Sequence, residues 1–106
     1  MSNIEDAVEN LTQAILYSRE YQDYRIQLKR VKEVPELKEK IDEYRTKNYI
    51  LQSSKDYAFD KIEAFEREYA DFVENPLVMD FLDAELSLCR MIQGVSDKVV
   101  MALHFE

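Results

Sequence analysis

The amino-acid sequence predicts an all-α protein, and three observations lead to that prediction. Glycine occurs once and proline twice in 106 residues, whereas an all-β chain needs a turn roughly every 8–12 residues. Apolar residues recur at alternating spacings of three and four, the period of one side of a helix. Charged residues make up 34% of the chain and mostly fill the positions between them. We therefore expect an elongated antiparallel hairpin or bundle of three to four helices, completed by dimerisation.

The length and charge of the chain exclude several classes of protein. The length suits a single domain, 1–106. Fourteen basic against 22 acidic residues give a net charge of −8, which disfavours direct nucleic-acid binding. No segment approaches the roughly 18 apolar residues of a membrane span. The acidic N-terminus does not resemble a signal peptide, and the single Cys89 cannot form an internal disulfide. We expect a cytoplasmic protein.

The first helix is expected to begin near Ser2 or Asn3, either of which can cap it. It should stop by Val34, because a residue that precedes proline is disfavoured in the helical region. Val8 and Ile15 widen its apolar face in the N-terminal half. The stripe along this helix consists of Ile4, Ala7, Leu11, Ala14, Tyr17, Tyr21, Tyr24, Leu28 and Val31.

The second helix, residues 35–75, organises the rest of the prediction. Pro35 is suited to the first turn, with Glu36 and Glu39 beside it. An unbroken helix of this length is about 60 Å long, more than a compact domain of this size is wide. Its stripe is therefore expected to need a second chain to cover it. The stripe positions are Leu37, Ile41, Tyr44, Asn48, Leu51, Lys55, Ala58, Ile62, Phe65, Tyr69 and Phe72, and all except Ala58 are candidates for helix packing or a dimer interface.

Two features of this stripe leave alternatives open. Ser53 and Ser54 are weak helix formers, and Ser53 with Asp56 resembles a capping box, so the long helix either continues or divides there. Asn48 and Lys55 are polar residues on the stripe. They either fix the register and oligomeric state of the helices or lie at the rim of the packed surface.

The third helix is expected to begin at Asn75 and Pro76, a capping residue followed by a proline in the first turn. Glu85 lies within its apolar face, where it is either a ligand or contact residue or a satisfied polar contact that sets the register. Gly94 could end this helix, with Ser96 capping a short final piece. The apolar positions are Val78, Phe81, Leu82, Leu88, Cys89, Ile92, Val95, Val99 and Leu103.

Motifs for catalysis or cofactor binding are not found in the sequence. One glycine cannot form a phosphate-binding loop. Cys89 and His104 are too few for a zinc site, and Cys89, on the apolar face, is expected to behave as a small hydrophobic residue. The Glu-x-x-His motifs of di-metal bundles are absent, although a purely carboxylate site remains an alternative. We expect no enzyme activity and no cofactor.

Three segments resemble the YlbF/YmcA family of small helical bacterial proteins. Residues 75–95, NPLVMDFLDAELSLCRMIQGV, are similar to its pattern of Asn-Pro, an aliphatic run and Ala-Glu-x-x-Leu. Residues 37–52 resemble the family's second helix and residues 7–31 its first. The resemblance makes Asn75, Pro76 and Glu85 structural signature positions rather than catalytic ones.

The resemblance implies a non-enzymatic cytoplasmic protein that forms dimers through its helices. Some members of the family are accessory factors of the endoribonuclease RNase Y and thereby influence mRNA maturation, competence, sporulation and biofilm formation. Some of those complexes hold iron–sulfur clusters through several cysteines, a property that a chain with only Cys89 does not share. The expected partners are a second copy or paralogues, and RNase Y.

Three hypotheses about function follow. The first is a regulatory or adaptor protein that acts on RNA processing through protein contacts. The second is a structural or chaperone-like helical subunit with a different partner. The third is a carboxylate metal-binding bundle centred on Glu85.

Overall fold

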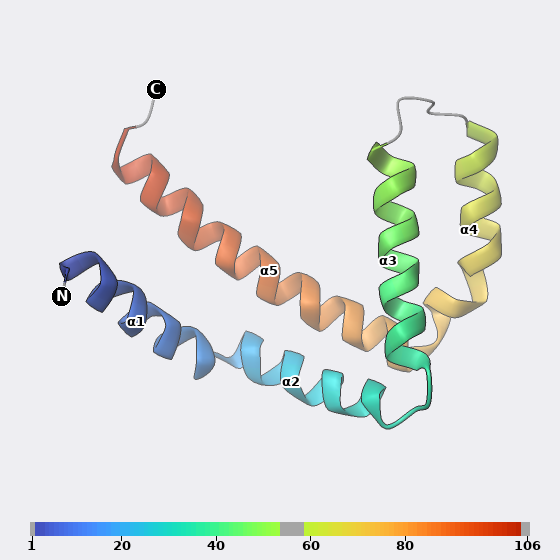
Figure 1. The fold of residues 1–106 in the computed structure, drawn as a ribbon, viewed down its shortest axis with the longest axis horizontal. Coiled ribbons are helices and arrows are strands. Elements are labelled where there is room, and N and C mark those ends of the chain that lie inside the picture. The colour runs from blue at the N-terminus through green and yellow to red at the C-terminus, as the bar shows by residue number, and fades with distance from the viewer. Residues whose placement is uncertain (1, 54–58, 105–106) are drawn as a thin grey trace. The chain divides into compact units, whose positions relative to one another are not determined.

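The computed structural model describes residues 2–53 and 59–104, and every regular element in these residues is an α-helix. The helices are α1 (Asn3–Leu16), α2 (Arg19–Lys32), α3 (Leu37–Ser53), α4 (Phe59–Glu74) and α5 (Pro76–Ala102) (Figure 1). The predicted all-α class is confirmed. The predicted number of helices is wrong, because the first and second expected helices are each divided in two.

The chain forms two compact units. Unit 1 comprises residues 1–27 and 81–106, and unit 2 comprises residues 28–80. Helices α2 and α5 therefore each contribute residues to both units. The prediction of a single domain is not tested by this division and stays a prediction.

The first expected helix is interrupted at Tyr17 and Ser18, which separate α1 from α2. The Ser18 hydroxyl accepts a hydrogen bond from the backbone N–H of Tyr21 at 3.1 Å and donates one to the Ile15 carbonyl at 2.6 Å. The amide of Gln22 donates to the Leu16 carbonyl at 2.7 Å. Ser18 is thus the N-cap of α2, and these bonds satisfy backbone groups that a helix end leaves unpaired.

Helix α3 begins at Leu37, two residues later than predicted, because a tight turn precedes it. The Leu37 N–H donates to the Val34 carbonyl at 3.2 Å, and Glu36 has a φ of 67°. Proline at the second position and a positive φ at the third are features of a type II turn. Glycine is the usual residue with a positive φ. Because this position holds a glutamate, the sequence does not indicate the turn.

Helices α3 and α4 lie side by side and run in opposite directions (Figure 1). The prediction of one continuous helix over 35–75 is therefore wrong, and the alternative of a division after Ser53 holds. An apolar stripe with a period of 3.5 residues indicates which side of a helix is buried. It does not indicate whether the helix that covers this side belongs to the same chain. Lys55 lies outside the described residues.

Helix α5 begins as predicted and ends later than predicted. The Asn75 side-chain oxygen accepts from the Leu77 N–H at 3.0 Å, and its carbonyl accepts from the Met79 N–H at 2.9 Å. Pro76 occupies the first position of the helix, where it has no N–H to leave unpaired. Gly94 and Ser96 do not divide the helix, which continues to Ala102. One glycine lowers helix stability by only about 1 kcal/mol, too little to end a helix of this length.

The buried side chains are distributed unequally between the units. Unit 2 buries six apolar or aromatic residues contributed by all four of its helical segments: Leu28, Val31, Leu37, Ile41, Tyr69 and Val78. In the described part of unit 1 only Phe81 is buried, and its ring lies 5.7 Å from that of Tyr24 on α2. Most of the packed interior therefore belongs to unit 2.

Replacement of Ser18 tests the break between α1 and α2. Ser18→Ala removes the N-cap hydroxyl and should lower the free energy of unfolding by about 1 kcal/mol, measured by urea denaturation at fixed protein concentration. Ser87→Ala, an exposed position inside α5, is the matched control and should cause no loss, because alanine is the better helix former. A stability gain for Ser18→Ala would mean that α1 and α2 form one helix in solution.

Candidate protein-interaction surface

The apolar stripe predicted for residues 37–72 is divided between α3 and α4. Its two halves contact each other across the α3–α4 hairpin. The Tyr44 ring on α3 stacks on Phe65 with centroids 5.5 Å apart. The same ring contacts Tyr69 edge-on at 5.1 Å and Phe72 at 5.8 Å. The three α4 residues lie four and three positions apart, on one face of that helix. Tyr44 is therefore the α3 side chain that joins the two helices through rings.

All nine candidates of this stripe that lie in the described residues are buried or half-buried. Leu37, Ile41 and Tyr69 are buried, and Tyr44, Asn48, Leu51, Ile62, Phe65 and Phe72 are half-buried. Asn48 accepts a hydrogen bond from the Gln52 side chain at 3.4 Å. The tenth candidate, Lys55, is outside the described residues. The role of these positions in a contact with a second chain stays a prediction.

Charged side chains along α3 pair with one another at helical spacing. The Lys38 Nζ atom lies 2.7 and 2.8 Å from the two carboxylate oxygens of Asp42, and Arg45 donates to the same carboxylate. The hydrogen bond from Lys38 lowers the pKa of Asp42, partial desolvation opposes the shift, and the hydrogen bond from Arg45 adds to it. These exposed pairs support α3 and leave the charge in solvent.

Two lysines of α3 cover the rings of α4. The Lys40 Nζ atom lies 5.4 Å from the Phe72 ring centroid, and that of Lys47 lies 5.6 Å from the Tyr69 centroid. Lys47 also pairs with Glu43 at 2.9 Å. The Glu43 carboxylate, followed by the Tyr69 side chain, raises the pKa of Lys47 above its usual value. Both ammonium groups shield the aromatic cluster from one side.

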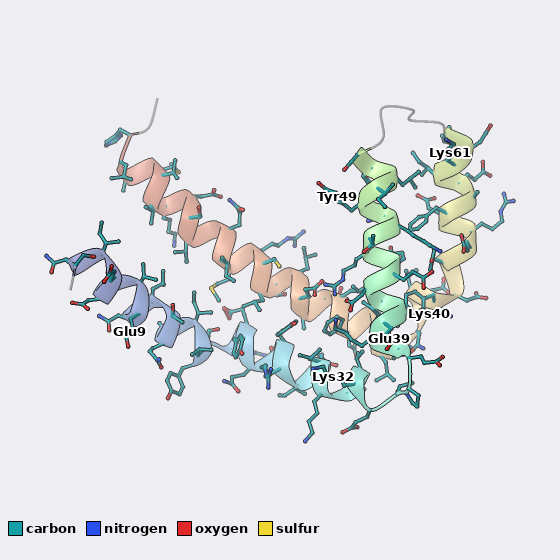
Figure 2. The ribbon with its side chains drawn as sticks, viewed as in Figure 1. Glu9, Lys32, Glu39, Lys40, Tyr49 and Lys61 are labelled. Atoms are coloured by element: carbon teal, nitrogen blue, oxygen red, sulfur yellow. The ribbon has the colours of Figure 1, made fainter. Side chains whose placement is uncertain are left out.

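An open cavity of about 380 Å³ lies between α3 and α4 near the end of the hairpin. Figure 2 shows Lys61 at this end of α4, and Tyr49 on α3 pointing away from α4. The rim of this cavity carries charges of both signs. Its lining consists of Lys47, Ile50, Leu51, Lys61, Ala64, Phe65 and Glu68.

In unit 1 the structure changes two expectations about α5. Cys89 is exposed, so the prediction that it packs as a small hydrophobic residue on a buried face is wrong. Glu85 is half-buried and has an interaction partner, rather than sitting in a closed apolar core. Both differences have one cause: the apolar face of α5 in unit 1 is only partly covered.

Two apolar stripes of unit 1 are uncovered in the described residues. None of residues 3–16 is buried, and Ile4 is 76% exposed. On α5 the stripe that starts half-buried at Leu88 becomes exposed toward Leu103, which is 63% exposed. We call the following exposed side chains the open apolar surface: Ile4, Val8 and Leu11 of α1, Ile92 and Val99 of α5, and Leu103, which directly follows α5.

The sequence analysis did not single out this surface, because an amphipathic stripe does not tell whether the surface that covers it belongs to the same chain. The feature of the sequence that could have indicated this surface was the composition of the two stripes. The α1 and α5 stripes hold no charged residue at these six positions, whereas the stripe of residues 37–72 contains Asn48 and Lys55. Exposed apolar patches of this kind mark sites of protein contact.

Other kinds of site were also sought in the structure. Among residues 2–53 and 59–104, no three His, Cys, Asp or Glu side chains form a group that could hold a metal ion. In the same residues, no helix is both long enough and apolar enough to cross a membrane.

Comparison with known families gave one match. The sequence model of the family described as "Control of competence regulator ComK, YlbF/YmcA" matches residues 4–104. This match confirms the resemblance drawn from residues 7–31, 37–52 and 75–95, and the description gives the family a regulatory role. No curated protein and no solved structure was found to match the chain.

The aromatic cluster can be tested with two tyrosines of the same helix. Tyr44→Ala removes a ring in contact with three others and should lower the free energy of unfolding by about 2–4 kcal/mol. Tyr49→Ala removes a ring that is 73% exposed and should change it by less than about 0.5 kcal/mol. Urea denaturation at equal protein concentration measures both. Equal effects of the two substitutions would contradict the packing described for α3 and α4.

The pairing of Asp42 predicts a pH dependence with a definite sign. Because the pKa of Asp42 is lowered in the folded state from 3.8, its contribution to stability is present above pH 3.8 and is lost as the pH falls through the folded value. The difference in urea midpoint between the wild type and Asp42→Asn should therefore be constant from about pH 7 to 5 and shrink toward pH 3. Glu66→Gln, a change at an α4 carboxylate with no ion pair among the described residues, is the control. A difference that grows on acidification would contradict the pairing.

Proposed function

Because the chain belongs to the YlbF/YmcA family, we propose that it is a non-enzymatic cytoplasmic regulatory protein that acts through helix-mediated contacts with other proteins. The observation that carries this proposal is the open apolar surface on α1 and α5. Exposed aliphatic side chains at helical spacing bind other helices well, because the contact removes apolar area from water and needs no charged partner.

The partners that we propose are a second copy or paralogues, and RNase Y, for which the chain serves as an accessory factor in mRNA processing. This places it among regulators of competence, sporulation and biofilm formation. The support for this proposal is the family resemblance together with the net charge of −8. An acidic protein is repelled by RNA, so an effect on RNA processing is best exerted through a nuclease that holds the RNA.

The charged residues of α3 and α4 agree with a role in which the nuclease, and not this chain, binds the RNA. On α3 the basic residues Lys38, Arg45 and Lys47 are paired with carboxylates. On α4 Arg67 pairs with Glu63 at 3.1 Å. These cations are therefore neutralised locally and do not form a basic stripe that could follow a phosphate backbone.

Capture of the nuclease tests the proposal. The immobilised chain, alone or with its paralogues, should retain the purified soluble part of RNase Y, and the same beads without the chain should not. In a parallel gel-shift assay the chain alone should not shift labelled single-stranded RNA at micromolar concentration. Retention of RNA without the nuclease, or turnover of a substrate by the chain alone, would contradict the proposal.

A further inference from the structure

The cavity between α3 and α4 lies in a groove to which each helix contributes one face. On α3 it is lined by Lys47 and by the residues three and four positions further on, Ile50 and Leu51. On α4 the lining residues are those at positions 61, 64, 65 and 68, at the same spacings. Residues spaced in this way share one side of a helix. The groove therefore extends over seven residue steps of α4, about 10 Å along the helix axis.

The floor of this α3–α4 groove is apolar and is not covered by the residues that the structure describes. Ile50 lines the cavity and is nevertheless 62% exposed. Ala64 is exposed, and Leu51 and Phe65 are half-buried. The short side chain of Ala64 leaves room for another chain to approach α4 closely. A groove between two helices with such a floor can receive the apolar face of a third, amphipathic helix.

The groove is formed on a hairpin that is already packed at one end of it. The Tyr44 ring contacts three rings of α4. The Lys47 ammonium group lies 5.6 Å from the centroid of the Tyr69 ring and 2.9 Å from the carboxylate of Glu43. Because these contacts hold α3 and α4 together before a partner arrives, binding in the groove requires little ordering of the hairpin.

The charges on the rim indicate the chemistry of the partner. Two lysines and one glutamate line the cavity, a balance of +1 in a chain whose net charge is −8. Lys47 is paired with Glu43. Lys61, at the outer end of α4 (Figure 2), is exposed and makes no ion pair with the rest of the described chain. Glu68 lies seven residue steps from it, so the two charges stand at opposite ends of the groove. A partner carboxylate is therefore favoured beside Lys61.

We propose that the α3–α4 groove binds an amphipathic helix of a partner protein, with an apolar side chain in the cavity and a carboxylate beside Lys61. The apolar contact supplies affinity, and the ion pair selects acidic helices over basic ones. This inference deepens the proposed function and rests on its premise of helix-mediated contact. It assigns a partner site to unit 2, whereas the open apolar surface belongs to unit 1.

Peptide binding gives the first test. Two fluorescein-labelled helical peptides share leucines at spacings of three and four and carry either glutamates or lysines at the same positions beside that stripe. In a fluorescence anisotropy titration, the chain should bind the acidic peptide about tenfold more tightly than the basic one. Equal affinities, or tighter binding of the basic peptide, would overturn the proposal.

Two alanines of α4 test the location of the site. Ala64→Glu places a charged side chain in the groove and should weaken binding of the acidic peptide by about tenfold or more. Ala70→Glu is the matched control, because Ala70 is also exposed but lies about 120° away around the helix. It should leave the affinity unchanged within about twofold. Equal effects of the two substitutions would mean that the peptide binds elsewhere, and the proposal would be wrong.

Charge reversal tests the contact of the carboxylate with Lys61. Lys61→Glu should weaken binding of the acidic peptide and strengthen that of the basic peptide, so that the preference reverses. Lys98→Glu changes an exposed lysine of α5 and gives the same net charge, but it should keep the preference for the acidic peptide. A preference that survives Lys61→Glu, or that both substitutions reverse, would contradict the proposed contact.

The remaining outcomes separate this inference from other occupants and from the proposed function. Sedimentation of the wild type and of Ala64→Glu should give equal masses. A lower mass for Ala64→Glu would mean that a second copy fills the groove, and it would overturn the proposal. None of these assays contains the nuclease. Selective binding of the acidic peptide without capture of RNase Y therefore contradicts only the proposed function, and capture of RNase Y by a chain that does not distinguish the peptides contradicts only this inference.

Discussion

The packing of the Tyr44 ring against three rings of α4 is the contact on which the hairpin of unit 2 depends. Phe65, Tyr69 and Phe72 meet it from one face of α4 at centroid distances of 5.1–5.8 Å. Aromatic side chains bury large areas, so one residue of α3 can hold several turns of α4 in place. The lysines at positions 40 and 47 lie over the Phe72 and Tyr69 rings, respectively. This contact holds α3 and α4 together and contributes to the burial of Tyr69.

The sequence predicted which side of each helix is apolar, but not where the helices end. Residues 37–51 and 62–72 keep one stripe in phase, and that pattern is the same for one long helix and for two helices that face each other. Periodicity depends on local geometry, whereas the choice between these arrangements depends on tertiary contacts. The adjacent serines at positions 53 and 54 were the one local signal for the division. Their weak helix propensity alone could not decide against a stripe of eleven positions.

The helix caps show, for single residues, the same limit of prediction from local sequence. Ser2 or Asn3, and Asn75, were predicted as caps because each precedes a helical pattern. In the structure the Ser2 side chain accepts from the N–H three positions ahead and that of Asn75 from the N–H two positions ahead. Ser18 makes an equivalent bond, but it lies inside a stripe that continues through the break. The positive φ of Glu36 could not be predicted, because the sequence has no glycine there. The open apolar surface was missed for another reason: an amphipathic pattern does not tell which protein covers it.

The two units differ in how their helices are stabilised, and this difference bears on regulation. Among the described residues, unit 2 buries six apolar or aromatic side chains of its own, so packing within the chain stabilises its helices. In unit 1 none of the α1 residues is buried, so packing within the chain contributes less to this helix than to α3 and α4. A helix of 14 residues is marginally stable by itself in water, so the stability of α1 is sensitive to any contact that covers its apolar stripe.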